Sequence, residues 1–118
     1  MLSMLPLDGQ EKQRRGFAEN ALVFTAVERG QELGLAAAEL KDGILSLDTL
    51  SFPEGDSAVA DGLVRAVLNA AMERDVLYAV LNAPVEPAVR TALYGDFPID
   101  APFSIGLFFA QLKHCKGC

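Results

Sequence analysis

The most reactive side chains of this sequence lie in its last segment, Lys113-His-Cys-Lys-Gly-Cys118. Cys115 and Cys118 have the Cys-x-x-Cys spacing, which allows two thiols to bind one metal ion or to form a local disulfide. His114 is the single histidine of the chain and could supply a third ligand. Because zinc prefers thiolate and imidazole ligands, His114, Cys115 and Cys118 form a candidate zinc site. Inert free thiols and a redox pair are the alternatives that the same residues allow.

The composition is that of a small folded domain with an acidic charge balance. The 118 residues carry a formal charge of −6, and 22% of them are charged. A phosphate backbone requires a basic face, so we expect no nucleic-acid partner, whereas a small-molecule ligand is compatible with this composition. Hydrophobic residues make up 51% of the chain, a high share for a body with so much surface relative to its core. We therefore expect one domain over residues 1–118 that forms a homodimer through an apolar surface.

The N-terminal apolar run, Met1 to Leu7, does not read as a targeting or membrane segment. Ser3 and Pro6 interrupt it, and no positive charges precede a longer apolar core, as they would in a secretory signal. No stretch of the chain approaches the ~20 apolar residues that a membrane-spanning helix needs. The sequence therefore predicts a cytoplasmic protein without a membrane segment, in which cysteines are reduced thiols.

The first half of the chain predicts strands joined by turns. Met1–Leu7, Ala21–Val27 and Glu32–Leu40 are apolar or β-branched segments that are short for helices. Lys41-Asp42-Gly43 indicates a hairpin, because Asp-Gly suits the turns that match strand twist. The strand after this turn, Ile44–Phe52, alternates in polarity. Strict alternation would place five of its residues on one face: Ile44, Ser46, Asp48, Leu50 and Phe52.

Two helices are predicted, one after the first strand and one after Ile44–Phe52. Asp8 can cap a first helix over Gln10–Glu19, which Gly16 weakens. Ala58–Arg74 has the clearest helical pattern, with Asp56 or Ser57 as its cap. Its apolar residues recur at threes and fours and should form one buried stripe, with Asp61 and Arg65 lying off it. The stripe consists of Val59, Leu63, Ala66, Val67, Ala70 and Ala71.

The second half continues with a strand, a helix and a last strand. Val76–Leu81 is nearly all apolar, as expected of a strand covered on both faces. Pro87 can begin a helix that runs to Tyr94, and Phe103–Ala110 is predicted to be the final strand. The resulting order, β-α-β-β-β-α-β-α-β, predicts an α/β fold with a mixed sheet and helices on its faces.

The order of elements over Gly43–Phe97 resembles the cofactor-binding half of GNAT-type N-acetyltransferases. The stretch from Leu50 to Val76 and the Tyr-x-x-Phe ending at Phe97 carry the likeness. The resemblance implies a GNAT-like fold and transfer of an acyl group from acetyl-CoA or another acyl-CoA to an amine. It also implies that the backbone amides that begin the long helix bind the cofactor's pyrophosphate. In this sequence those residues are Ser57, Ala58, Val59 and Ala60.

The same resemblance assigns three further residues. Tyr94 would protonate the departing CoA thiolate, Asp48 would deprotonate the acceptor amine, and Asn82 would help to bind the cofactor. The plainer alternative makes Tyr94 a packing residue and Asp48 a strand residue whose hydrogen bonds are satisfied. At the cofactor loop, Gly55, Ala58 and Ala60 stand where the family has Arg or Gln, Gly, and Gly or Ala. A non-catalytic interaction or regulatory module with this fold is therefore the rival function, besides a metal- or thiol-binding role of the C-terminal segment.

Overall fold

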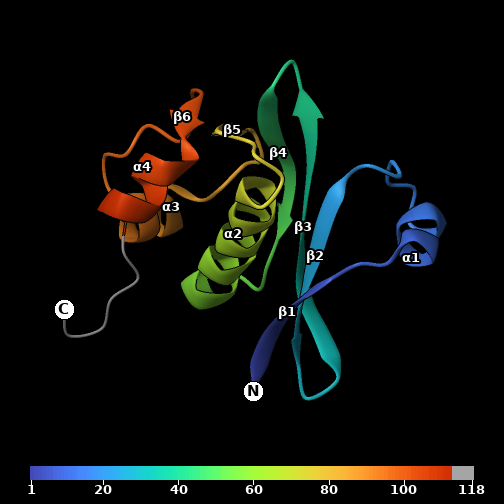
Figure 1. The fold of residues 1–118 in the computed structure, drawn as a ribbon. Coiled ribbons are helices and arrows are strands. Elements are labelled where there is room, and N and C mark those ends of the chain that lie inside the picture. Colours follow the sequence, from blue (N-terminus) through green and yellow to red (C-terminus); the bar gives the residue numbers. More distant parts are fainter. Residues whose placement is uncertain (113–118) are drawn as a thin grey trace.

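The computed structural model describes residues 1–112, in which one sheet of six strands is covered on one face by helices. Figure 1 shows α2 lying across the sheet, with α3 and α4 beside it and α1 at the opposite side of the molecule. The elements in chain order are β1 (Leu2–Pro6), α1 (Gly9–Arg14), β2 (Leu22–Glu28), β3 (Gln31–Lys41), β4 (Ile44–Ser51), α2 (Ser57–Met72), β5 (Tyr78–Leu81), α3 (Pro87–Tyr94), β6 (Phe103–Ser104) and α4 (Ile105–Gln111).

The sheet is mixed, as predicted. Its strands lie in sequence order from β1 to β6, and β4 and β5 are parallel neighbours whereas every other neighbouring pair is antiparallel. The parallel pair is joined through α2, which makes the predicted strand–helix–strand crossover. Asp42 and Gly43 both have positive φ angles, of 53° and 81°, so the turn between β3 and β4 has the mirror-image geometry that Asp-Gly favours. None of the helices in residues 1–112 is long and apolar enough to cross a membrane.

A β-bulge in β4 overturns the strict alternation predicted for this strand. Ala38 pairs with Leu47 but Ala37 pairs with Thr49. Asp48 is therefore an extra residue whose backbone is not paired with any residue of β3. The extra residue reverses the order of inward and outward side chains. Leu47 points into the core before the bulge, and Leu50 packs against the same core after it.

The core lies between the sheet and α2. Asp56 caps this helix by accepting a hydrogen bond from the Val59 amide at 3.1 Å, which confirms Asp56 as the cap. The predicted apolar stripe is buried except at Ala66, which is partly exposed. Asp61 is also buried, in contrast to the expectation that it lies off the stripe. It is paired with Arg65, whose Nε atom lies 2.9 Å from Oδ2 of Asp61, and the Arg65 guanidinium lies over the ring of Phe108 on α4.

The predicted last strand, Phe103–Ala110, is mostly a helix. β6 contains only Phe103 and Ser104, and α4 begins directly after it. The Ser104 hydroxyl caps α4 by accepting from the Leu107 amide at 3.2 Å. Ile105 and Phe108 are buried on one side of α4, which is the spacing of a helix face. A short apolar run does not distinguish a buried strand from a buried helix, and here packing against α2 decided the outcome.

Two smaller expectations also differ from the structure. α1 ends at Arg14, well before the predicted Glu19, because the chain turns at Gly16 with a φ of 83°. β5 is shorter than predicted and is not covered on both faces, since half of the Tyr78 surface is exposed.

Candidate functional site

The start of α2 is the region that the resemblance assigned to cofactor binding. Three of its four implied amides already donate hydrogen bonds within the chain. The Ser57 amide donates to the Gly55 carbonyl at 3.0 Å, and the Ala60 amide donates to the Asp56 carbonyl at 3.2 Å. The Val59 amide is taken by the Asp56 side chain. An anion arriving here would have to displace these acceptors.

The charge at this helix end opposes a diphosphate group. A helix N-terminus attracts anions through its free backbone amides and through the positive end of the helix macrodipole. In this chain the Asp56 carboxylate already occupies that position as the cap, and exposed Glu54 adds a second negative charge in the same loop. The residues present therefore do not fit the pyrophosphate of acetyl-CoA.

Asp48 and Asn82, which the resemblance placed at the site, are brought together by the bulge of β4 and the end of β5. The Asn82 side-chain amide donates to the Ser46 hydroxyl at 2.5 Å and lies 3.5 Å from Oδ1 of Asp48. The Ser46 hydroxyl donates to the same Asp48 oxygen at 2.6 Å. Lys41 completes this polar cluster by pairing with Oδ2 of Asp48 at 3.1 Å. Every member of the cluster is hydrogen-bonded to another member.

These contacts make Asp48 a weak proton acceptor. Burial raises the pKa of Asp48, whereas hydrogen bonds from Ser46 and Lys41 lower it. Together the lowering effects are larger than the effect of burial, so the pKa of Asp48 lies below its ordinary value. The carboxylate is consequently ionised at neutral pH and holds a proton poorly. A general base works best with a pKa near the operating pH, so a catalytic Asp48 would need a raised pKa and not a lowered one.

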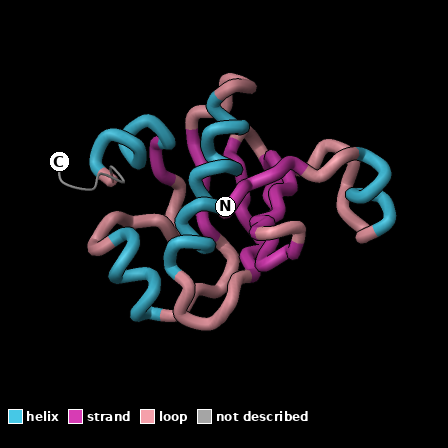
Figure 2. Tube along the Cα trace, turned by 90° about the horizontal axis from the view of Figure 1, so that it is seen from below, coloured by secondary structure: helices cyan, strands magenta, loops and turns pink. Residues whose placement is uncertain are grey.

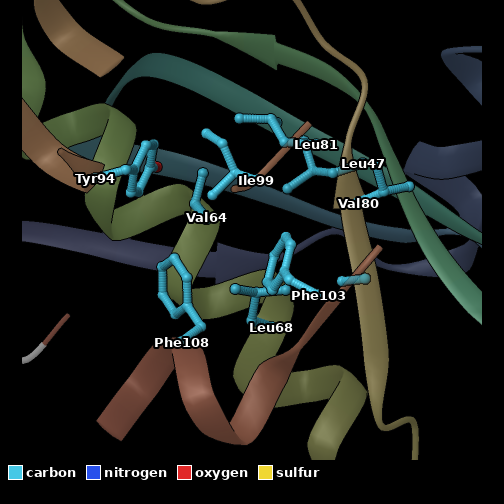
Figure 3. A pocket seen from close by; sticks show the side chains of 10 residues that line it. Leu47, Val64, Leu68, Val80, Leu81, Tyr94, Ile99, Phe103 and Phe108 are labelled. Carbon is cyan, nitrogen blue, oxygen red and sulfur yellow. The ribbon is translucent and has the colours of Figure 1, made fainter. Parts of the chain in front are cut away.

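Tyr94 lies on the other side of the sheet from this cluster. Its ring is 2% exposed and lines a cavity of about 10 Å³ whose other walls are apolar (Figure 3). The cavity also contacts Leu47 and Leu81 at the sheet, and Val64, Ile99 and Phe108 from the covering elements. This volume is about that of one water molecule, so the interior at Tyr94 is filled by the chain's own side chains.

The Tyr94 hydroxyl has no hydrogen-bond partner among residues 1–112. Burial and the nearby charge of Asp61 raise the pKa of Tyr94 above its ordinary value. The structure thus places Tyr94 in the core, whereas Asp48 lines a groove of about 50 Å³ on the face of the sheet opposite α2, together with Phe17 and Ala37. The two residues assigned to acid and base catalysis do not face one common space.

Sequence reasoning missed Ser46 and Lys41, the residues that hold Asp48. Both lie on strands next to the Asp-Gly turn, and a serine two residues before an aspartate on a strand lies on the same face as it. That spacing was the one available signal for Ser46, and the sequence does not show the bulge at Asp48.

The candidate zinc ligands His114, Cys115 and Cys118 lie outside the described residues. Within residues 1–112, no group of three or more His, Cys, Asp or Glu side chains is arranged to hold a metal ion.

Several solved structures with a similar arrangement of elements are acetyltransferases. The ribosomal-protein-S18-alanine N-acetyltransferase of Escherichia coli has a TM-score of 0.63 and 16% identity, with 80% of this chain and 74% of that chain covered. The IAA acetyltransferase of Bacillus cereus has a TM-score of 0.56 and 11% identity, with 69% and 65% covered. A GNAT family acetyltransferase from Elizabethkingia anophelis, solved with acetyl-CoA bound, has a TM-score of 0.56 and 9% identity, with 68% and 63% covered.

These comparisons establish the fold. The chain has the fold of the GNAT-type N-acetyltransferases, as its sequence predicted. It spans less than two thirds of the length of two of these three structures. No protein-family model matches the sequence, and no curated protein is detectably similar to it.

Proposed function

We propose that this chain is a non-catalytic interaction module built on a GNAT-type fold and that it does not use acetyl-CoA. The observation that carries the proposal is the start of α2, where the Ser57, Val59 and Ala60 amides are already hydrogen-bonded and Asp56 supplies the anion. A shared fold does not imply a shared activity, because chemistry depends on the site and not on the scaffold.

The interior of the fold supports the same proposal. The elements beside α2, from Tyr94 to Phe108, fill the space next to β5 and leave a cavity of about 10 Å³. A small-molecule site usually measures about 300–1,000 Å³. An acyl group with its thioester could enter at Tyr94 only if several core side chains moved.

The second candidate is an acyl-CoA-dependent N-acyltransferase, and the closeness of Asp48 and Asn82 favours it. In that case Asp48 would accept a proton from an acceptor amine at the face of the sheet opposite α2, and Asn82 would hold the Asp48 carboxylate in place. The lowered pKa of Asp48 and the buried hydroxyl of Tyr94 weigh against this candidate.

Calorimetric titration with acetyl-CoA separates the two functions. We expect no saturable binding by the wild-type chain. A dissociation constant below about 1 mM, equivalent to a binding free energy of about −4 kcal/mol, would contradict the proposal. A stabilisation of the fold by acetyl-CoA in a thermal melt would contradict it independently, since a ligand that binds the folded state raises its stability.

A matched variant tests whether charge is the reason. Asp56→Asn combined with Glu54→Gln removes both negative charges, and asparagine retains a side-chain oxygen that can cap α2. If acetyl-CoA binds this variant but not the wild-type chain, the carboxylates are the barrier. If neither binds, the occupied amides and the filled interior suffice to exclude the cofactor.

A further inference from the structure

The face of the sheet opposite α2 presents two rows of side chains that the strand register defines. Ile44 on β4 pairs with Lys41 on β3 and with Tyr78 on β5, so these three side chains form one row. Ser46 on β4 pairs in the same way with Glu39 and Val80, which form the next row. Directly paired residues project from the same face of a sheet.

These rows point away from the helices. The rows that alternate with them contain Leu45, Leu47 and Ala79, which share one buried cluster with side chains of α2, α3 and α4. The remaining helix, α1, lies at the far end of the molecule, as Figure 2 shows, and the segment after it packs through Phe17 against β2 and β3. We call the side of β3, β4 and β5 that faces away from α2 the outer face. Within residues 1–112 it is therefore left without a covering helix.

Three apolar side chains of the outer face are partly exposed, beside the buried hydroxyl of Ser46. Half of the Tyr78 surface is accessible, and Ile44 and Val80 on either side of it are half-buried. A tyrosine at the centre of an apolar patch is typical of residues that contribute strongly to a protein–protein interface.

Charges of both signs lie at the β3 edge of the outer face. Lys41 is in the first row and Glu39 in the second, two residues apart on the same strand. Both are exposed, and Glu39 forms no ion pair among the described residues. Lys41 also pairs with Asp48 of its own chain at 3.1 Å, but its side chain remains 59% exposed. Lys41 and Glu39 are therefore both accessible to the opposite charge of a second copy.

We propose that the outer face is the interface with a second copy of this chain. A two-fold axis that runs across the strands, between the two rows, exchanges one row for the other. It would place Lys41 opposite the partner's Glu39 and Tyr78 opposite the partner's Val80. Each contact is repeated by the symmetry, so two ion pairs lie together at the β3 edge, beside the apolar contacts that Ile44, Tyr78 and Val80 make with the partner. The outer face is a different surface from the start of α2, so a dimer formed through it does not depend on whether acetyl-CoA binds.

Sedimentation equilibrium tests the interface. We expect the wild-type chain to have twice the mass of the 12.6 kDa monomer at tens of micromolar. Tyr78→Lys should give a monomer, because it places a charge at the apolar centre. Leu107→Lys is the matched control: Leu107 is 53% exposed on α4, outside the outer face, so this variant should remain a dimer. Circular dichroism confirms that each variant is folded.

A charge-reversal pair tests the two-fold geometry itself. Glu39→Lys and Lys41→Glu should each weaken the dimer by about tenfold or more, because each places like charges opposite one another twice. An equimolar mixture of these two variants should recover the dimer, since each copy then faces the opposite sign. A monomeric wild-type chain, or a dimer that Tyr78→Lys leaves intact, would overturn the interface. Failure of the mixture to reassociate would overturn the proposed axis.

Discussion

Replacing Tyr94 by phenylalanine is the sharpest test of the buried site. The substitution removes a hydroxyl that is buried and has no hydrogen-bond partner among the described residues, and it keeps the ring. That ring contacts Phe108, with 5.9 Å between the two ring centroids, and this packing should survive. If Tyr94 serves the fold and not a reaction, Tyr94→Phe should stabilise the chain.

The magnitude follows from two opposing effects. A buried polar group without a partner costs about 1–3 kcal/mol, which the variant recovers. Loss of the oxygen enlarges the neighbouring cavity by roughly 10 Å³, which costs only about 0.2 kcal/mol at ~24 cal/mol per Å³. We therefore expect the free energy of unfolding to rise by about 1 kcal/mol. For a domain of this size, that gain raises Tm by roughly 4 °C.

Urea unfolding followed by circular dichroism measures this change, because the chain lacks tryptophan and the substitution alters tyrosine fluorescence. Tyr78→Phe is the matched control: it removes the same atom from a half-exposed ring, at which we expect a change within about 0.5 kcal/mol. The control is measured at low concentration, where the chain is a monomer.

A loss of stability in Tyr94→Phe would refute this reasoning. It would mean that the hydroxyl has a polar partner in solution, and that the interior at Tyr94 is open to water or to a ligand. The second candidate function would then gain support, since a catalytic acid must be reachable from the acyl-CoA thiolate.

The remaining predictions concern a cap, a carboxylate and the C-terminal thiols. Asp56→Ala removes the side chain that caps α2 and should lower the free energy of unfolding by about 1 kcal/mol in urea titrations, whereas Asp56→Asn should change it little. Asp48 has a lowered pKa when folded, so its contribution to stability is present above its ordinary value of 3.8 and is lost as pH falls through the folded value. Asp48→Asn should therefore flatten the acid side of the stability profile, and an unchanged profile would show that the polar cluster does not form. Zinc analysis of protein purified without chelator should find metal that a Cys115→Ser, Cys118→Ser variant loses, and equal zinc in both would leave free thiols or a redox pair.

Local chemistry explains why much of the fold was predictable. The Asp-Gly turn, the Asp56 cap and the start of α3 at Pro87 each depend on conformational preferences of a few neighbouring residues. These preferences act over one turn or one hairpin, so they can be read from the residues in order. Most of the order of elements followed from them, and the resemblance of that order to GNAT-type enzymes implied the fold.

The site was less predictable because it depends on contacts between distant segments. The bulge at Asp48 arises from the pairing of β4 with β3, and Asn82 reaches Ser46 and Asp48 because β5 pairs with β4. The resemblance pointed to Asp48 and Asn82 as residues of one site, but it could not show that their polar atoms are already paired. The same limit applies to the helix start, where the amides of Ser57 and Val59 are taken by acceptors from the preceding loop.

Adjacent residues were sufficient to predict the elements from β1 to α3, their order and the acidic loop before α2, because propensity, capping and turn chemistry act locally. Tertiary structure alone decided which groups are available. It made Ile105–Gln111 a helix by burying Ile105 and Phe108 beside α2, and it enclosed the Tyr94 hydroxyl among apolar side chains. It also left the outer face without a covering helix within residues 1–112. Burial and hydrogen bonding join residues far apart in the chain, so no local pattern could specify them.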